Sequence, residues 1–278
     1  MKILVTGANG YIGSNVVTRL IGLGHKVIAV DLDNKHIHPD ANFCKFDIFT
    51  DNECDWYKRT DCPDVCIHLA WKDGFVHNST AHMSQLSSHF IFLKNLIDNG
   101  LQQLIVMGTM HEVGYYEGAV TENTDCRPLS LYGVSKNALR QALTVYTSDK
   151  PVIFQWLRGF YLYGKDSYGN SIFYKIKTAE NRGEKFFPFT TGKNKYDFLY
   201  IDEFVNQVVQ VAMQTSVKGI INICSGEPVS LGEAIEKYIS DEGFAIKLDY
   251  GKYPERPYDS PCIYGDNTKI QLILKGNK

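Results

Sequence analysis

Short, continuously apolar runs alternate along the chain with longer segments whose apolar residues recur at helical spacing. The short runs are typical of strands covered on both faces, and the longer segments carry apolar residues every three or four positions, as at Leu86, Phe90, Leu93 and Ile97. This pattern predicts strands at 2–5, 26–30, 65–69, 104–107, 152–157 and 219–223, and helices at 14–23, 84–97, 132–146 and 202–214. Because strands that alternate with helices form parallel sheets, we expect an α/β fold with a doubly wound Rossmann sheet.

The regular alternation lapses in two places, at 160–196 and 224–278, which hold most of the later Gly, Pro and aromatic residues. We interpret these segments as a smaller, discontinuous α/β lobe, and 1–159 together with 197–223 as the Rossmann domain. Within the lobe, Ser230 and Glu233 form a capping-box pattern that predicts the start of a helix, since each side chain can satisfy an exposed backbone donor.

Composition narrows the class of protein. The chain has 278 residues and a net charge of -2, from 29 basic and 31 acidic residues, which favours a folded domain of ordinary size and argues against a nucleic-acid partner. Its seven cysteines contain no CxxC pair, so we expect reduced thiols and no metal site. The N-terminus shows no signal-peptide pattern and no apolar stretch reaches about 18 residues, so we expect a cytoplasmic protein without a membrane partner.

A glycine-rich loop lies between the first predicted strand and the first predicted helix. Residues 6–13 read Thr-Gly-Ala-Asn-Gly-Tyr-Ile-Gly, in the context that a dinucleotide-binding fingerprint needs. Gly7 would allow the tight turn, Gly10 would let the backbone approach a pyrophosphate, and Gly13 would let helix and strand pack closely. The loop therefore predicts dinucleotide binding, the alternative being a merely flexible turn.

The second predicted strand ends at Asp31, which bears on the choice of cofactor. A carboxylate there can accept both hydroxyls of an adenosine ribose and repels a 2′-phosphate, so NAD(H) is favoured. NADP(H) stays open because Lys35 and His36 could serve a phosphate, and Asp31 could also simply begin a polar turn with Asp33 and Asn34.

A tyrosine stands four residues before a lysine at three places: Tyr132 and Lys136, Tyr146 and Lys150, and Tyr161 and Lys165. In a helix this spacing puts both side chains on one face. Lys150 precedes a proline, which suggests a helix end, and Tyr161 follows a predicted strand, whereas Tyr132 opens a predicted helix. Tyr132 and Lys136 are therefore the candidate catalytic pair.

Further motifs occur in the same order as in a known family. They are Gly7, Gly10 and Gly13, Asp31, Asp47-Ile48, His68-Leu69-Ala70, Thr109, Tyr132 with Lys136, Arg158 with Tyr163-Gly164, the run from Tyr196 to Asp202, and Asn222 near Ser225-Gly226. Through them nearly the whole chain resembles the extended branch of the short-chain dehydrogenase/reductase superfamily, the NAD-dependent epimerase/dehydratase family that acts on nucleotide sugars.

The resemblance implies roles for individual residues. Tyr132 would be the acid/base, its phenol pKa lowered by Lys136, and Thr109 would orient and polarise the substrate carbonyl. The implied cofactor contacts are Gly7, Asn9, Gly10, Tyr11, Ile12, Gly13, Asp31, Asp47, Ile48, Leu69, Ala70, Tyr132 and Lys136. The implied contacts to the diphosphate of the sugar nucleotide are Asn170, Arg256 and Lys195, with Lys193 as the alternative to Lys195.

Departures from the family pattern bear on the reaction. Dehydratases of this family place Asp and Glu directly after the Thr, but Met110 and His111 stand there, which argues against a dehydratase. His111 could be a further acid/base that supports an epimerisation step, or it could simply hydrogen-bond the loop or Glu112.

The resemblance implies an NAD(P)H-dependent reduction of the C4 ketone of a nucleotide-linked 4-keto-6-deoxyhexose. A dTDP-4-dehydro-6-deoxyglucose, used in surface-polysaccharide synthesis, is the expected substrate. One alternative is a nucleotide-sugar 4-epimerase of the UDP-glucose type with tightly bound NAD, and another is a non-catalytic NAD-binding regulator. Family members commonly pair through the helices that correspond to 84–97 and 132–146, so we expect a homodimer, although Leu86, Phe90 and Leu93 could instead face the protein's own sheet.

Overall fold

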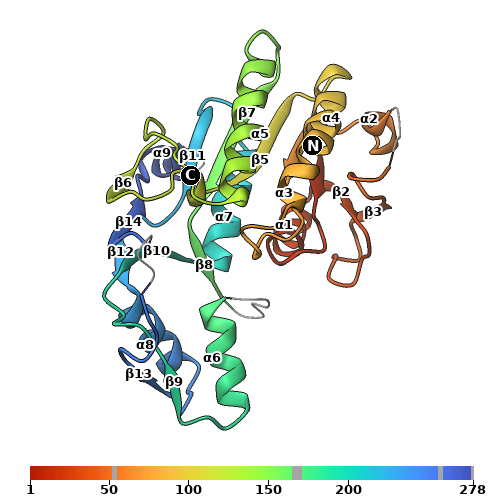
Figure 1. Ribbon diagram of the computed structural model, residues 1–278. Helices are drawn as coiled ribbons and strands as arrows, with labels where there is room; N and C mark the ends of the chain where they lie inside the picture. Colours follow the sequence, from red (N-terminus) through yellow and green to blue (C-terminus); the bar gives the residue numbers. More distant parts are fainter. Residues whose placement is uncertain (52–54, 165–170, 256–258, 277–278) are drawn as a thin grey trace.

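Seven parallel strands form the main sheet in the order β11-β7-β5-β4-β1-β2-β3 (Figure 1). The structure is a computed structural model, and it describes residues 1–51, 55–164, 171–255 and 259–276. The strands are β1 (Lys2–Thr6), β2 (Lys26–Asp31), β3 (Asn42–Lys45), β4 (Val65–His68), β5 (Gln103–Thr109), β7 (Ile153–Gly159) and β11 (Gly219–Ile223). The strand order reverses between β1 and β4, so the ends of these strands border the crevice where α/β sheets bind ligands.

Helices cover both faces of this sheet. One face carries α1 (Tyr11–Gly22), α7 (Ile201–Ala212) and α9 (Thr268–Gly276), and the other carries α2 (Trp56–Arg59), α4 (Leu86–Asp98) and α5 (Leu131–Thr147). In β1 the side chains alternate accordingly, because Ile3 and Val5 pack in the first core cluster and Leu4 in the second. The sequence prediction of a doubly wound Rossmann sheet is confirmed.

A smaller lobe lies beside the carboxyl ends of the strands (Figure 1). Its sheets contain β6 (Gly118–Val120), β8 (Tyr161–Tyr163), β10 (Lys195–Tyr200), β12 (Pro228–Ser230) and β14 (Cys262–Gly265), and the pair β9 (Phe186–Pro188) and β13 (Lys247–Asp249). Two helices, α6 (Ile172–Asn181) and α8 (Leu231–Asp241), share an apolar cluster that includes Phe173, Ile235 and Tyr238. The discontinuous second α/β lobe is thus present, and its residue boundaries stay a prediction.

One buried carboxylate in this lobe forms hydrogen bonds with segments that are distant in the sequence. Asp197 of β10 is fully buried, and its oxygens accept hydrogen bonds from the main-chain N–H groups of Ser225, Gly226 and Gly265 at 2.7 to 3.1 Å. A buried carboxylate is stable only when donors satisfy it in this way. Asp197 therefore links β10 to the segments that follow β11 and end β14.

Side-chain caps that are local in the sequence begin several helices, among them α2, α5, α6 and α8. The capping box at Ser230 and Glu233 is confirmed, since each side chain accepts the other residue's main-chain N–H at 3.2 Å and α8 begins at Leu231. The helix expected at 84–97 is α4, which begins at Leu86, and a separate short helix, α3 (Ala81–Ser84), precedes it. None of the helices in the described ranges is long and apolar enough to cross a membrane.

Candidate functional site

The glycine loop turns tightly between β1 and α1. Gly7 has a φ of +67°, and a Cβ atom there would lie 2.7 Å from the main-chain nitrogen of Ala70. A Cβ on Gly13 would lie 2.0 Å from the carbonyl oxygen of Gly7. Gly10 is the N-cap of α1, so the positive end of that helix faces the loop. The loop and helix end form a cradle of the shape and polarity that a pyrophosphate needs.

Asp31 lies at the end of β2 beside this loop. Its two oxygens accept the main-chain N–H groups of Asn9, at 2.9 Å, and Leu32, at 2.7 Å. The side chain of Asn9 in turn donates to Asp33 and accepts the main-chain N–H of His36. The structure therefore places a half-exposed carboxylate next to the cradle, as a ribose-binding residue requires.

The other predicted cofactor residues surround the same crevice. Tyr11 and Ile12 are half-buried in the first turn of α1, and Ile48 is buried beyond the end of β3. Leu69 and Ala70 follow β4 directly and lie against Gly7. Asp47 accepts the main-chain N–H of Phe49 at 2.9 Å, so part of its hydrogen-bonding capacity is already used within its own turn.

Thr109, Tyr132 and Lys136 come together where β5 ends and α5 begins. Burial raises the pKa of Tyr132 to about 12, against the opposing effect of a hydrogen bond with Thr109. Burial also lowers the pKa of Lys136 to about 7, and the charge of Glu112 opposes that shift. The Lys136 side chain donates to the carbonyl oxygen of Met107 at 2.6 Å, and its nitrogen is 5.9 Å from the centroid of the Tyr132 ring.

This result corrects one expectation. The resemblance implied a lowered pKa for Tyr132, but in the structure the net effect is a raised pKa of the phenol. The physical reason is burial, which disfavours the charged form of both groups.

Trp71 is a site residue that sequence reasoning missed. Its ring lies 3.7 Å from the side-chain nitrogen of Lys136 and stacks on His89, with ring centroids 4.3 Å apart. Its indole N–H donates to Nδ1 of His82 at 3.0 Å. Because an indole nitrogen only donates, Nδ1 of His82 is the acceptor and Nε2 carries the proton, which points at the Val76 carbonyl oxygen 3.0 Å away.

Two buried histidines lie behind Trp71. Nδ1 of His68 is 2.8 Å from the Thr6 hydroxyl, and Nε2 of His68 is 2.9 Å from Nδ1 of His89. Burial lowers the pKa of His68 to about 3 and that of His89 well below its ordinary value. Both rings are therefore neutral at physiological pH and act as hydrogen-bonding groups.

The loop at 71–80 covers the start of α5. The carbonyl oxygen of His77 accepts the main-chain N–H of Tyr132 at 2.8 Å, and the Asn78 side chain accepts that of Leu131 at 3.2 Å. The His77 ring is stacked parallel to Tyr132 at 5.6 Å and lies 4.5 Å from the ring of His111. His111 is half-buried, and its ring lies 6.2 Å from that of Tyr132, a position that assigns it no chemical step.

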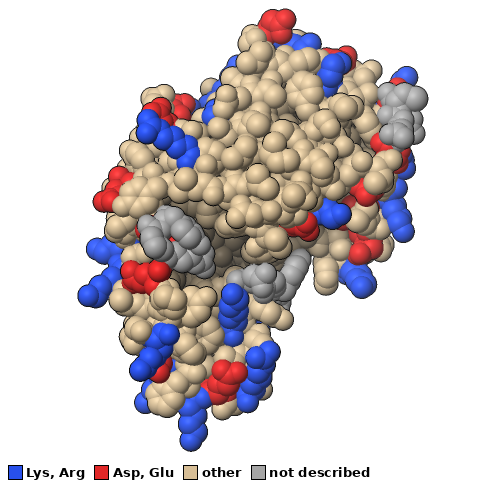
Figure 2. Space-filling view, viewed as in Figure 1, with Lys and Arg blue, Asp and Glu red and all other residues tan. Residues whose placement is uncertain are grey.

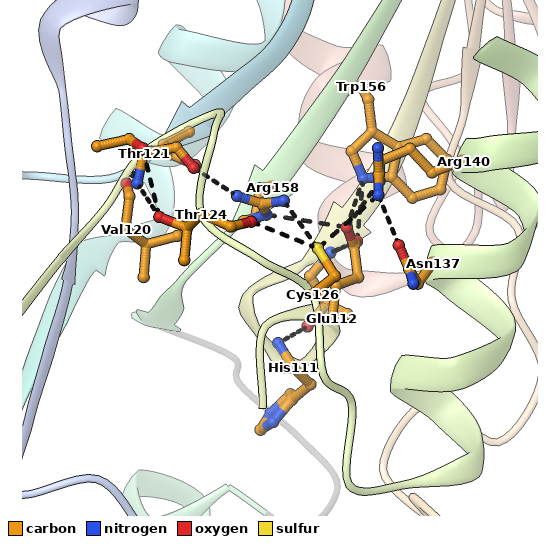
Figure 3. A network of polar contacts seen from close by, with 12 residues as sticks. His111, Glu112, Val120, Thr121, Thr124, Cys126, Asn137, Arg140, Trp156 and Arg158 are labelled. Carbon is orange, nitrogen blue, oxygen red and sulfur yellow. Dashed lines mark hydrogen bonds and ion pairs between the residues drawn. The ribbon is translucent and has the colours of Figure 1, made fainter. Parts of the chain in front are cut away.

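Glu112 is a second residue that sequence reasoning missed, although a signal was present. Thr109 and Glu112 form a capping box around η1 (Met110–Glu112), the same pattern that the sequence shows at Ser230 and Glu233. The Glu112 side chain is fully buried and accepts the main-chain N–H of Thr109 at 2.7 Å (Figure 3).

Of the residues predicted to contact the diphosphate, the structure describes Lys195 and its alternative Lys193. Asn170 and Arg256 lie outside the described residues. Lys195 is exposed at the start of β10, where its main-chain N–H donates to the Pro261 carbonyl oxygen at 2.8 Å, and Lys193 is also exposed. The roles of these residues stay predictions.

Comparison with known proteins gives three findings. The model of the NAD dependent epimerase/dehydratase family matches residues 3–224. A dTDP-6-deoxy-L-talose 4-dehydrogenase (NAD(+)) of Aggregatibacter actinomycetemcomitans is 39% identical over 272 residues, which cover 95% of this chain and 99% of that protein. The UDP-glucose 4-epimerase of Thermotoga maritima with UDP-glucose is 24% identical, with a TM-score of 0.84 and coverage of 98% of this chain and 92% of that one, a likeness that shows the fold alone.

Proposed function

The chain belongs to the NAD-dependent epimerase/dehydratase family, and from this premise we propose that it is a dehydrogenase/reductase that interconverts the C4 alcohol and the C4 ketone of a nucleotide-linked 6-deoxyhexose. The observation that carries the proposal is the set of Thr109, Tyr132 and Lys136 around one point. Met110 and His111 stand where a dehydratase of the family has two carboxylic acids, so water loss from the sugar has no acid and base there.

The name of the relative from Aggregatibacter actinomycetemcomitans supports a choice of first substrate. It describes oxidation at C4 of dTDP-6-deoxy-L-talose with NAD(+), which is the reverse of a C4 ketone reduction. We therefore choose dTDP-6-deoxy-L-talose and its 4-keto counterpart as the first substrate pair. The 4-keto-6-deoxyglucose nucleotide expected from the sequence has the same reacting group and differs in stereochemistry.

The residues present fit NAD. The cradle of Gly7, Gly10 and Gly13 would hold the pyrophosphate at the positive end of α1, and Asp31 would hold the adenosine ribose. When bound, NAD supplies or accepts the hydride at C4.

The chain's own residues handle the proton. With a pKa raised to about 12, Tyr132 is protonated at neutral pH and can donate its proton to the C4 oxygen during ketone reduction. The Thr109 hydroxyl, at the end of β5, orients that oxygen. The Lys136 ammonium stabilises the negative charge that Tyr132 acquires when it gives up the proton.

A coupled assay tests this proposal. Purified protein would be mixed with NAD(+) and dTDP-6-deoxy-L-talose, with NADH formation followed by absorbance and the sugar product by chromatography, and with NADP(+) and UDP-glucose in parallel. We expect NADH to form in proportion to a 4-keto product. Interconversion of UDP-hexoses without net NADH would contradict the proposal and support the 4-epimerase, and NAD binding without turnover of any sugar would support a regulator.

A matched pair of variants assigns the chemistry to the site. Tyr132→Phe should bind NAD normally and lose about 100-fold or more in kcat, since it removes the acid/base. Tyr146→Phe is the control, because Tyr146 of α5 also stands four residues before a lysine, Lys150, but donates to Asp98 on the surface. Equal activity in the two variants would remove Tyr132 from the mechanism.

A further inference from the structure

Glu112 is a buried carboxylate to which the proposed reaction assigns no role. It lies where β5 turns into η1, directly after the strand that ends at Thr109 (Figure 3). One oxygen, Oε1, accepts the main-chain N–H of Thr109 at 2.7 Å. The indole N–H of Trp156 points at both oxygens, at 3.0 and 3.1 Å.

Two guanidinium groups from different elements face the same carboxylate. Nε of Arg140 on α5 is 3.7 Å from Oε2 of Glu112, and Nε of Arg158 on β7 is 3.8 Å from it. Arg158 is itself fully buried and donates to the Thr121 carbonyl oxygen at 3.0 Å and to Sγ of Cys126 at 3.6 Å. The contacts of Glu112 named here are thus N–H donors and cations. A neutral carboxylic acid would have to donate its own proton, and none of these groups can accept it. Burial raises the pKa of the Glu112 carboxyl, and Arg158, the Thr109 N–H group, Trp156 and Arg140 oppose that rise, so these neighbours favour the ionised form of Glu112.

The backbone of β5 is adapted to admit this carboxylate. A Cβ atom on Gly108 would lie 2.1 Å from Nε1 of Trp156 and 2.5 Å from Oε1 of Glu112. Any other residue at Gly108 would therefore separate Glu112 from Trp156. The arrangement is a built site for one negative charge beside the reaction centre.

The surroundings of Lys136 show what this charge does. The ammonium is buried among the Met107 carbonyl oxygen, the Trp71 ring and the Tyr132 ring, and the neutral rings of His68 and His89 lie on the neighbouring elements β4 and α4. Lys136 donates to the carbonyl oxygen of Met107 and Glu112 accepts the main-chain N–H of Thr109, so both charges contact the same end of β5, two residues apart. Burial lowers the pKa of Lys136, and the negative charge of Glu112 opposes that effect. The charge of Glu112 also affects Tyr132. It raises the pKa of the phenol, as burial does.

We propose that Glu112 is a positioning residue of the reaction centre: its carboxylate fixes the main chain at Thr109 and supplies the negative charge that favours the ammonium form of Lys136. The hydroxyl oxygen of Thr109 accepts the main-chain N–H of His111 at 3.3 Å, so the carboxylate and the hydroxyl close one rigid turn. The proposal deepens the proposed function and rests on it for the identity of the reacting groups.

The charge of Lys136 can be followed without substrate or cofactor. The full chain would be labelled with [ε-13C]lysine and titrated by NMR, with Lys136→Met to assign the resonance. We expect a wild-type midpoint of about 7. Glu112→Gln should lower the midpoint by about half a unit or more, because it removes the charge and keeps the shape.

Two further variants separate the parts of the proposal. Glu112→Asp keeps the charge but is too short to reach the Thr109 N–H in the same geometry, so we expect the midpoint to stay near that of the wild type while kcat falls about tenfold with little change in KM. Glu233→Gln is the matched control, because Glu233 closes an exposed capping box at the start of α8. It should change neither the midpoint nor kcat.

An unchanged midpoint in Glu112→Gln, or an equal fall in Glu233→Gln, would overturn the proposal. If Glu112→Gln does not fold, Glu112→Asp carries the test, and an unchanged kcat in that variant would then overturn the proposal. Because the titration needs no turnover, failure to oxidise a dTDP-6-deoxyhexose would contradict the proposed function alone.

Discussion

The side-chain nitrogen of Lys136 lies 3.7 Å from the centroid of the Trp71 indole ring. An aromatic face attracts an ammonium, so Trp71 offsets part of the desolvation that lowers the pKa of this lysine. The ring cannot turn away freely, because it donates to His82 on one side and stacks on His89 on the other. Trp71 is therefore a fixed platform for the candidate catalytic lysine.

Replacement of Trp71 should move the pH dependence of ketone reduction. Activity falls as pH rises through the pKa of Lys136, since the ammonium form supports charge on Tyr132. Trp71→Leu should lower that pKa, and so move the alkaline limb of kcat to lower pH by about half a unit, whereas Trp71→Phe keeps an aromatic face and should move it less. Steady-state rates over a pH series measure the effect, and an identical alkaline limb in Trp71→Leu would contradict it.

Acid should destabilise the protein through His68. The pKa of this ring is about 3 in the folded state and 6.5 when unfolded, so below pH 6.5 the unfolded chain takes up a proton that the folded chain does not. The free energy of unfolding should then fall by about 1.4 kcal/mol per pH unit from this residue alone. Urea unfolding at several pH values measures the slope. His68→Gln should flatten it, and the control His36→Gln, at an exposed histidine, should leave it unchanged.

Asp31 should set the preference between the two dinucleotides. Asp31→Asn keeps hydrogen-bond acceptance but removes the charge that repels a 2′-phosphate, so we expect about tenfold weaker NAD binding and a smaller NAD-to-NADP ratio of affinities. Calorimetric titration of both cofactors measures this ratio. Asp33→Asn is the control, because Asp33 bonds only the neighbouring Asn9 side chain and local main chain in the structure's described part. A ratio that falls equally in both variants would show that Asp31 has no special role.

His111 should be dispensable for C4 oxidation and reduction. The half-buried ring lies 6.2 Å from that of Tyr132, but a hydride and one proton suffice for the proposed reaction, and Tyr132 supplies the proton. We therefore expect His111→Asn to retain kcat within about threefold of the wild type. A loss of 100-fold or more, together with solvent deuterium in the sugar product at C3 or C5, would instead assign His111 to an epimerisation step.

The face of α4 and α5 should pair with a second copy of the chain. Leu93 is buried against the protein's own sheet, and Leu86 and Phe90 pack partly against the same core. Leu86 and Phe90 also line an apolar groove together with Met83 of α3 and Ala142 of α5. Figure 2 shows uncharged side chains over the broad upper-central surface, where α4 and α5 lie, whereas charged side chains of both signs lie around its edges and over α6 and α8. An apolar patch of this kind is typical of an interface.

Light scattering on a sizing column tests this pairing. Ala142→Glu should convert a dimer into a monomer, because a charge would be buried in the interface. Leu272→Glu on the exposed side of α9 is the control and should leave the dimer intact. A monomeric wild-type protein would contradict the expectation.

The amino-acid sequence by itself determined the features that depend on neighbours along the chain. Apolar periodicity predicted six of the seven strands of the main sheet and the helices α1, α4, α5 and α7, but not β3, α2 or α9. The three glycines predicted the turn between β1 and α1, and the spacing of Tyr132 and Lys136 placed both on one face of α5. The capping box at Ser230 was equally readable, and the same pattern at Thr109 and Glu112 could have been read from the sequence too. A capping box can be read from the sequence because both of its side chains bind backbone donors within the first turn of the same helix.

Only the tertiary structure decided which charges and rings meet at the reaction centre. Trp71, Glu112 and Lys136 come from three separate elements, and nothing in their local sequence shows that an indole face and a buried carboxylate act on one ammonium. The pKa of Tyr132 was predicted in the wrong direction for the same reason. Desolvation depends on everything packed around a group, and that packing exists only once the distant segments have come together.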